Sequence, residues 1–314
     1  MTQTESFPNR HVAVYGALRS GTTLLRLMLD AHSQLACPGE TDFLFDHLRG
    51  SDPSTPYDRN VLERSRIYRA HRDMYADQPL SELTPTAFVN RIAGPNKIAV
   101  LMLHRHISRA LALFPDLRIV HLLRDPRDVA RSSIGMGWAG NVYYGIDHWL
   151  DTEADWTNVS PQVPHENVLT VHYENLISEP EATLRAMCSF LNVDYEPAML
   201  EYDKTSTYSK PSKELTFQWK HKQSQREIAL VENKIGKLLT DRGYEPSGVV
   251  PHAPSVLEKA SLKFDNKRAQ WTRRVRRYGI VDPLIIALAR RLNAPELSAA
   301  AQRRLDDITI KHLK

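Results

Sequence analysis

The stretch from Val12 to Arg26, VAVYGALRSGTTLLR, constrains the fold of this chain more than any other part of the sequence. Its β-branched, apolar beginning predicts a buried strand, and the apolar spacing of its end predicts the start of a helix. A turn bounded by Gly16 and Gly21 lies between the two. Such a turn directs backbone N–H groups and a helix N-terminus toward an anion, so the stretch predicts a phosphate-binding loop.

The loop departs from the Walker pattern at one residue. Gly16 and Gly21 have the Walker spacing, but Thr22 stands where that pattern has its lysine, and Thr23 follows. The Walker lysine reaches the β- and γ-phosphates of a nucleotide. Its replacement, together with Arg19 inside the loop, therefore predicts a nucleotide that lacks a γ-phosphate. The pattern counts against ATPases and kinases, and a P-loop enzyme similar to nucleotide kinases is kept as an alternative.

A second motif begins at another strand end. Residues 117–123 (LRIVHLL) form an apolar run typical of a buried strand, and Arg124 follows it directly. Ser132 lies eight residues further on, about two turns into the helix expected from residue 126. Arginine suits phosphate recognition because its planar guanidinium binds two phosphate oxygens at once.

Together the two motifs resemble the cofactor-binding motifs of the sulfotransferases that use PAPS (3′-phosphoadenosine 5′-phosphosulfate). The resemblance covers about residues 10–245, and residues 24–40 (LLRLMLDAHSQLACPGE) are similar to the bacterial and tyrosylprotein branch of that family. It implies that the first loop holds the 5′-phosphosulfate and that Arg124 and Ser132 hold the 3′-phosphate. The implied cofactor-binding residues are Arg19, Ser20, Gly21, Thr22, Thr23, Arg124, Ser132, Tyr173 and Lys210.

Two of these assignments have alternatives. Tyr173 matches a family tyrosine near the adenine, but a core tyrosine at a strand end has the same pattern. Lys210 and Lys220 both lie in segments that resemble the C-terminal cofactor loop of the tyrosylprotein branch, so either would close over the nucleotide. No metal is expected, because the sulfuryl group carries less charge than a phosphoryl group and the sequence has no HExxH or CxxC spacing.

Sulfuryl transfer also needs a base for the acceptor hydroxyl and positive charge near the leaving oxygen. In the tyrosylprotein branch a glutamate at the position of Glu40 is the base, whereas the cytosolic branch uses a histidine that His104 matches. The resemblance implies Glu40, Arg19 and His104 as catalytic residues, with Glu40 as the predicted base and His104 as the alternative. Many members have a lysine near Met102, where this chain has none, and the candidates to replace it are Lys97, Arg105 and Arg19.

The remaining pattern predicts an α/β fold with a P-loop-like parallel sheet flanked by helices and a helical C-terminal appendage. Strands are expected at about 11–16, 97–103, 117–123 and 168–173, and helices at 21–32, 61–76, 107–114, from 126, at 180–191 and at 225–242. Thr84 before Pro85 predicts a helix N-terminus. Residues 247–254 are typical of a linker, which divides the chain into a domain at 1–250 and an extension at 251–314.

The extension begins with a capping box at Ser255–Glu258 and carries an apolar stripe of heptad spacing beside a run of basic residues. The stripe consists of Leu257, Phe264, Trp271 and Tyr278. A basic amphipathic helix of this kind suits an anionic membrane surface. The alternative is a helix that docks on the domain or on a second subunit of a homo-oligomer. The Gly- and aromatic-rich segment 135–149 either lines an acceptor pocket or packs around a helix start.

The bulk composition limits the class of protein. The sequence has no run of 18 apolar residues and no signal-peptide pattern, and its two cysteines suit a reducing cytosol. We therefore expect a cytoplasmic protein. A peripheral location at the inner face of the membrane is the alternative. A net charge of +4 does not indicate a nucleic-acid partner.

The sequence thus predicts a PAPS-dependent sulfotransferase that acts on a hydroxyl of a small metabolite or a lipid head group. A non-catalytic nucleotide-binding protein that docks on a lipid or protein is a further alternative, because the family lysine near Met102 is missing.

Overall fold

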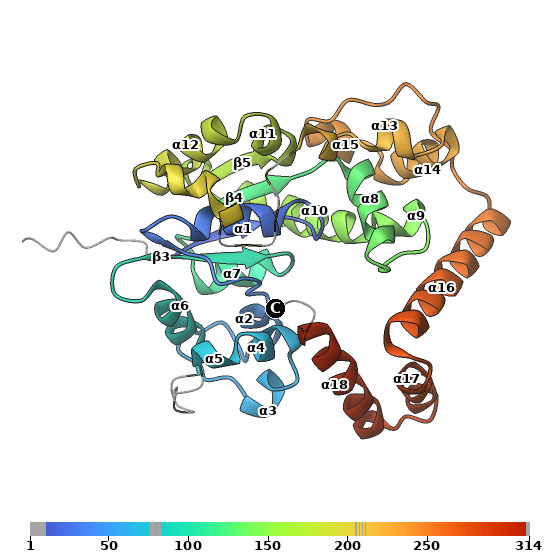
Figure 1. The fold of residues 1–314 in the computed structure, drawn as a ribbon, viewed down its shortest axis with the longest axis horizontal. Coiled ribbons are helices and arrows are strands. Elements are labelled where there is room, and N and C mark those ends of the chain that lie inside the picture. The colour runs from blue at the N-terminus through green and yellow to red at the C-terminus, as the bar shows by residue number, and fades with distance from the viewer. Residues whose placement is uncertain are drawn as a thin grey trace, which may run out of the picture.

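The computed structural model describes residues 11–75, 79, 83–204, 206, 208, 210 and 212–311. Five parallel strands form its central sheet in the order β2-β3-β1-β4-β5 (Figure 1). They are β1 (His11–Tyr15), β2 (Leu35–Ala36), β3 (Ile98–Leu103), β4 (Arg118–Leu123) and β5 (Val168–His172). The predicted α/β fold with a parallel sheet is confirmed. Because β1 is central, the loop after it opens between the carboxyl ends of β3 and β4, where open α/β sheets bind ligands.

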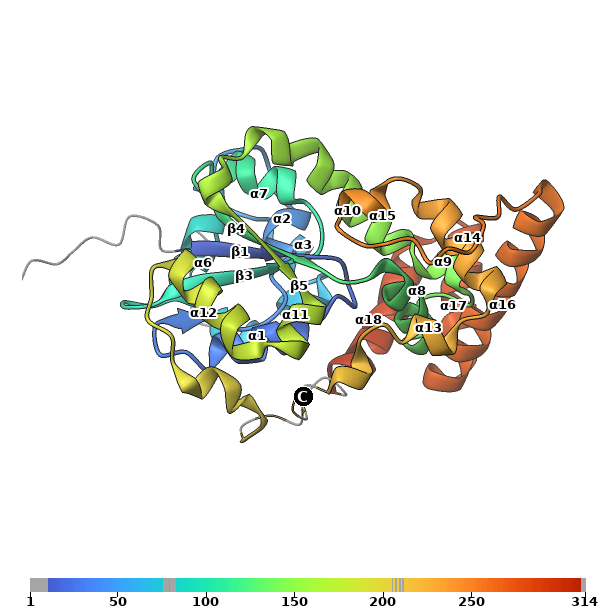
Figure 2. The same ribbon diagram turned by 90° about the horizontal axis from the view of Figure 1, so that it is seen from above.

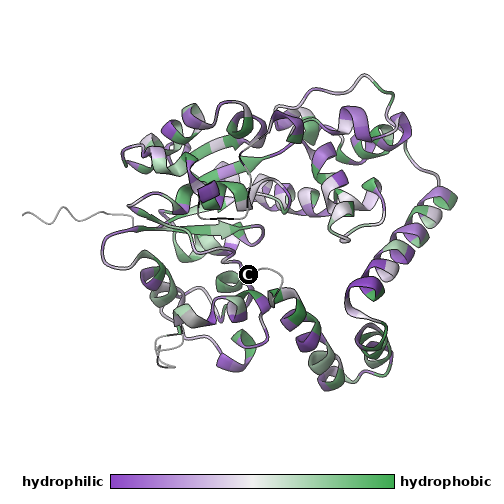
Figure 3. Cartoon of the chain, in the orientation of Figure 1, coloured by the Kyte–Doolittle hydropathy of each residue, from purple (hydrophilic) through white to green (hydrophobic). Residues whose placement is uncertain are grey.

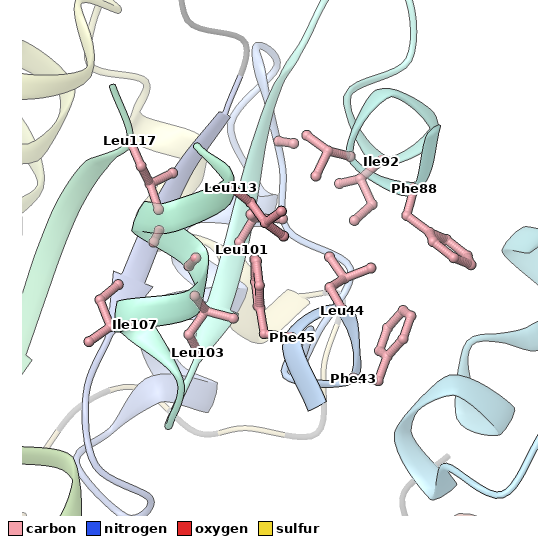
Figure 4. Close-up of a cluster of buried hydrophobic side chains, with 14 of the residues drawn as sticks. Phe43, Leu44, Phe45, Phe88, Ile92, Leu101, Leu103, Ile107, Leu113 and Leu117 are labelled. Atoms are coloured by element: carbon pink, nitrogen blue, oxygen red, sulfur yellow. The ribbon is translucent and has the colours of Figure 1, made fainter. Parts of the chain in front are cut away.

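Helices cover both faces of the sheet (Figure 2). Alternate side chains of each strand point to opposite faces, so Tyr15 and Leu101 belong to one core, and Val14 and Val100 belong to the other. Figure 4 shows the first core, in which side chains of α2, α6 and α7 meet those of β3. The bounds are α2 (Phe43–Asp46), α6 (Pro85–Ala93), α7 (Ile107–Leu113) and α10 (Asp147–Val159) on this face, and α1 (Thr22–Asp30), α11 (Tyr173–Ser178) and α12 (Pro180–Leu191) on the other.

Two segments predicted as single helices are broken. Residues 61–76 divide among short helices because Ser65 accepts a hydrogen bond from the Tyr68 N–H at 3.3 Å and caps a new helix. Residues 225–242 divide because Gly236 has φ +60°, which ends the first helix. The resulting helices are α3 (Arg59–Leu62), α4 (Arg66–Ala70), α5 (Arg72–Tyr75), α14 (Gln225–Ile235) and α15 (Leu238–Asp241).

The remaining elements join the sheet to the extension. The helices α8 (Pro126–Gly135) and α9 (Val142–Gly145) follow β4, and α13 (Trp219–Lys222) precedes α14. Short 3-10 helices occupy Ser160–Gln162, His165–Asn167, Pro197–Leu200, Tyr202–Lys204 and Lys213–Leu215. The predicted start of α6 is confirmed, since the Thr84 hydroxyl accepts from the Ala87 N–H at 3.1 Å and Pro85 stands at the first helical position.

The extension consists of α16 (Val256–Tyr278), α17 (Val281–Arg291) and α18 (Pro295–Lys311), which form an arch beside the domain (Figure 1). The predicted capping box at its start is only half formed. Ser255 accepts from the Glu258 N–H at 3.2 Å, but the Glu258 carboxylate pairs with Arg226 and His252 instead of closing the box. In the described part of the chain, no helix has the length and apolar character needed to span a membrane.

Both ends of the arch contact the domain. The Asn266 carboxamide oxygen accepts a hydrogen bond from the Gly140 N–H at 2.6 Å, which attaches α16 to the segment between α8 and α9. At the other end, the Arg69 guanidinium of α4 binds the carboxylates of Asp306 and Asp307, each at 2.8 Å. Figure 3 shows that hydrophilic residues dominate α16, whereas the central strands are hydrophobic.

Candidate active site

The turn between β1 and α1 has the backbone of an anion-binding loop. Arg19 has φ +75° and Gly21 has φ +92°, so two residues of the turn lie in the left-handed region. A side chain at Gly21 would also overlap the ring of Tyr173, which packs directly against the loop. Glycine is therefore needed at position 21 for its backbone and for the close approach of the tyrosine.

The two predicted cofactor motifs meet at Arg19. Its Nε donates a hydrogen bond to Ser132 Oγ at 2.9 Å, and its carbonyl oxygen accepts one from Arg124 Nη1 at 3.0 Å. The guanidinium carbon of Arg124 in turn lies 4.4 Å from the centre of the Tyr173 ring. The structure therefore brings Arg19, Arg124, Ser132 and Tyr173 together at the carboxyl end of the sheet, as the sequence predicted.

Polar groups of this cluster are left without partners inside the protein. Among the described residues, the buried Ser20 hydroxyl and the buried Arg124 Nε have no hydrogen-bond partner. Burial lowers the pKa of Arg19, and the neighbouring Arg124 charge acts in the same direction. Two adjacent guanidinium groups and an unsatisfied hydroxyl fit an anionic ligand, because phosphate oxygens would satisfy the donors and offset the repulsion.

Arg124 also has a carboxylate neighbour, Asp128, at 3.8 Å. The hydrogen bonds of its guanidinium go elsewhere, to the carbonyl oxygens of Arg19 and Leu215 at 3.0 and 2.9 Å. The Leu215 contact shows that the segment between Lys210 and Lys220 reaches Arg124, although the sequence did not single out Leu215. The neighbouring Asp125 is fully buried and binds Arg127 and Trp219 instead.

His104 lies under the loop, where both of its ring nitrogens are engaged. Nδ1 is 2.8 Å from the Asp42 carboxylate, and Nε2 is 3.2 Å from the Thr22 hydroxyl. Burial disfavours the charged imidazolium, but the Asp42 carboxylate outweighs burial and raises the pKa of His104. The same Asp42 accepts from the His104 backbone N–H at 2.8 Å. His104 is therefore a buried link between Asp42 and the first residue of α1.

Glu40 occupies a different position from His104. It forms an isolated parallel bridge with Met102, so it lies beside the carboxyl end of β3. Its side chain is exposed and lines a cavity of about 300 Å³ with Arg105 and Trp138. Within the described residues, no hydrogen bond or ion pair occupies the Glu40 carboxylate, and His71 packs against the preceding Gly39. The carboxylate is thus available to a ligand in this cavity.

The three candidates to replace the family lysine lie at different distances from the site. Met102 is buried, and Lys97 directly precedes β3, at the amino end of the parallel strands, whereas the loop lies at their carboxyl end, so the alternative that places Lys97 in the site is wrong. Arg105 lines the Glu40 cavity and binds the Asp46 carboxylate through Nε at 2.8 Å. Arg105 and Arg19 are therefore the cations that remain at the site.

The two lysines expected to close over the nucleotide are exposed. Lys210 interacts electrostatically with Glu201, and the ammonium of Lys220 lies 5.0 Å from the centre of the Phe217 ring. A cofactor role for either lysine stays a prediction. Thr23 is exposed at the start of α1, next to the buried Thr22.

Sequence reasoning missed Asp42 and did not connect Trp138 to the loop. The Asp42 carboxylate follows Glu40 by two residues, and that proximity to a candidate base was the available indication. Trp138 lies in the predicted aromatic segment, and its ring centre is 5.9 Å from the guanidinium carbon of Arg19. Trp149 of that segment is fully buried in the core, which agrees with the packing interpretation, whereas Trp138 lines the Glu40 cavity, and an acceptor pocket there stays a prediction.

Comparisons with known proteins agree with this architecture. A sequence profile described as the sulfotransferase family matches residues 11–197, which include Arg19, Glu40, His104, Arg124 and Ser132. The chain is 25% identical to an uncharacterized protein of Aquifex aeolicus over 62% of this chain and 27% of that protein. It is 24% identical to protein-tyrosine sulfotransferase 1 of Danio rerio over 82% of this chain and 78% of that protein.

The fold has a counterpart among solved structures. The sulfotransferase domain from the curacin biosynthetic pathway superimposes with a TM-score of 0.58 over 74% of this chain and 97% of that domain. The two sequences are 20% identical, so this likeness concerns the fold alone. The expected P-loop-like α/β architecture is confirmed by it.

Proposed function

The chain belongs to the sulfotransferase family of enzymes, and we propose that it transfers a sulfuryl group from PAPS to a hydroxyl of a small metabolite or a lipid head group. The observation that carries the proposal is the junction at Arg19, which joins the anion-binding loop to Arg124 and Ser132. Two separate phosphate-binding elements suit a nucleotide with phosphates on both sides of its ribose.

Different residues of the junction bind the 5′ and the 3′ side of the nucleotide. The backbone of residues 20–23 and the Ser20 hydroxyl face the 5′ side, whereas Arg124 and Ser132 serve the 3′-phosphate. Tyr173, packed between Gly21 and Arg124, contacts the adenine of the nucleotide. PAPS, when bound, supplies the sulfuryl group and a stable nucleotide leaving group. Arg19 provides positive charge at the leaving oxygen.

We assign the role of base to Glu40. A base must reach the acceptor hydroxyl, and the Glu40 carboxylate opens to a cavity, whereas His104 is 4% exposed and has both nitrogens engaged. His104 then acts as a positioning residue that holds Thr22 at the start of α1. The apolar side chains of Leu18, Ile67 and Trp138 in the cavity wall suit the carbon skeleton of a small acceptor.

The kinase-like alternative has less support. Thr22 stands at the Walker lysine position, and its hydroxyl contacts His104. Threonine carries no positive charge that could bind a γ-phosphate. The non-catalytic alternative has to be decided by experiment, because it predicts the same nucleotide binding without turnover.

The decisive experiment measures transfer of ³⁵S from labelled PAPS to a panel of hydroxylated metabolites and lipids by the full chain. We expect turnover with at least one acceptor, and a decrease of about 10²–10⁴-fold in Glu40→Gln, which keeps the size of the side chain but cannot take the proton. The affinity for adenosine 3′,5′-bisphosphate should stay nearly unchanged. Glu166→Gln, at an exposed glutamate away from the cavity, is the matched control.

Two results would contradict the proposal in different ways. Tight binding of adenosine 3′,5′-bisphosphate without turnover of any acceptor would favour the non-catalytic alternative. Loss of turnover in His104→Ala, with activity kept in Glu40→Gln, would exchange the two roles.

A further inference from the structure

A second and larger cavity lies where the extension meets the domain. Its volume is about 600 Å³, and its walls come from the segment after α8 and from α16 and α18. Its lining contains four basic side chains but a single carboxylate. The basic residues are Lys267, Arg273, Arg274 and Arg277, and the carboxylate is that of Asp306.

Trp138 connects this cavity to the site. The same side chain lines both the Glu40 cavity and the basic cavity, and its ring lies 5.9 Å from the guanidinium carbon of Arg19. The two cavities are therefore neighbours that share the Trp138 side chain in their walls. A ligand whose hydroxyl reaches Glu40 has the basic cavity within reach of its other end.

The charges in the basic cavity are not balanced by the protein. Asp306 is already held by Arg69 at 2.8 Å, and Arg273 binds the carbonyl oxygens of Ile134 and Gly135. Within the described residues, no carboxylate lies at ion-pair distance from Lys267, Arg274 or Arg277. A concave surface of one charge sign concentrates anions, and guanidinium groups bind phosphate through two oxygens at once.

We propose that the extension completes the acceptor site and selects an acceptor that carries a phosphate group. Arg274, Arg277 and Lys267 bind the phosphate, and the hydroxyl to be sulfated reaches Glu40 past Trp138. This proposal rests on the function proposed above. Trp271 and Tyr278 in the same wall offer aromatic faces to the carbon stem between the two groups. The family profile ends at residue 197, so the determinant of specificity lies outside the matched part of the chain.

The test uses ω-hydroxyalkyl phosphates of increasing chain length as probes, with the uncharged diols of equal length as matched ligands. Calorimetry on the full chain, saturated with adenosine 3′,5′-bisphosphate, measures binding, and labelled PAPS measures transfer. The variant is Arg274→Gln with Arg277→Gln, and Arg276→Gln is the control because Arg276 is exposed on the same helix outside the cavity lining.

We expect the phosphates to bind more tightly than the diols, and the double variant to weaken phosphate binding by about tenfold or more, the scale of lost charged hydrogen bonds. The control, the diols and the bound nucleotide should be unaffected. Equal binding of phosphates and diols, or equal phosphate binding by the double variant and the control, would overturn the proposal even if PAPS turnover persists. Variant-sensitive phosphate binding without turnover would instead remove the proposed function and leave the binding site standing.

Two further arms identify the source of the phosphate. sn-Glycerol 3-phosphate represents a free metabolite, and phosphatidylglycerol in phosphatidylcholine vesicles represents a lipid head group. Transfer that favours either one supports the phosphate-bearing acceptor and names its source. Transfer to neutral acceptors only, with equal KM in the double variant and the control, counts against it.

Discussion

Arg124 contacts the protein through part of its guanidinium, and we propose that the rest contacts the ligand. It donates to the Arg19 carbonyl and stacks on Tyr173, while its Nε is buried without a partner among the described residues. A 3′-phosphate would satisfy this donor. The residue is therefore expected to distinguish 3′-phosphorylated nucleotides from others.

Arg124→Ala should weaken the binding of adenosine 3′,5′-bisphosphate by about 1.5–3 kcal/mol, the scale of a charged hydrogen bond. The binding of ADP should change much less. Calorimetry with both ligands measures the difference. Arg131→Ala, at an exposed arginine of the same helix, is the control. Equal weakening of ADP would show that Arg124 acts through the shape of the loop and not through the 3′-phosphate.

The Asp42–His104 pair makes stability depend on pH. Asp42 raises the pKa of the buried His104, so the pair contributes its full stability below the ordinary histidine pKa of about 6.5. That contribution is lost as the pH rises through the folded-state pKa of His104. At the acid end it is lost as Asp42, whose own pKa is lowered, becomes protonated.

We expect Asp42→Asn to cost more free energy of unfolding at pH 5.5 than at pH 8.5. Urea unfolding measures both values. NMR titration should also show the His104 pKa falling below the ordinary value in this variant, because burial then acts without the carboxylate. Asp52→Asn, in an exposed loop, is the control. An identical His104 titration in wild type and Asp42→Asn would contradict the assignment.

At the scale of elements, some helices and strands follow from local sequence patterns, whereas others depend on contacts with distant residues. The predicted strands and the cap at Thr84 follow patterns of a few residues, and the structure confirms them. The two-residue strand β2 and the helix α10 were not predicted. β2 exists because it pairs with β3, and α10 is held by contacts from distant residues, such as the hydrogen bond of 3.0 Å from the Tyr15 hydroxyl to the Thr152 carbonyl.

The helix α16 combines two surfaces. Its Asn266 side faces the domain, whereas Leu257 and Phe264 of the heptad stripe are 84% and 67% exposed. The remaining stripe residues, Trp271 and Tyr278, line the basic cavity. The stripe thus has two fully outward-facing residues, Leu257 and Phe264, and two that line the cavity, of which Trp271 is still 38% exposed. Its exposed half is what a membrane surface or a second subunit would cover.

At the scale of the whole molecule, the exposed Leu257 and Phe264 belong to the helix that also lines the basic cavity. We expect the full chain to bind anionic vesicles at low salt, since each basic residue near such a surface contributes about 1 kcal/mol. Binding should weaken with salt, because the surface field decays within about 10 Å at 0.1 M. Co-sedimentation of the full chain, of a chain that ends at Val250 and of Phe264→Ser measures the effect.

Phosphatidylcholine vesicles are the control, and the truncated chain should show little binding to either kind of vesicle. If anionic vesicles do not bind the full chain, and Phe264→Ser or truncation instead dissociates an oligomer, the stripe is a subunit interface. Sedimentation velocity of the three proteins distinguishes this outcome.

By itself, the sequence predicted the glycine-bounded turn and the parallel sheet, because both follow from short patterns at strand ends, and the resemblance to the sulfotransferases named Arg19, Arg124 and Ser132. Through the resemblance it also named Glu40 as the predicted base and His104 as the alternative. Only the tertiary structure shows that His104 is buried against Asp42, 62 positions away, and that Glu40 opens to a cavity, and these two observations support the proposal that Glu40 is the base. The arch and the shared Trp138 wall likewise depend on contacts between distant segments, and no local pattern encodes which surfaces meet when the chain packs.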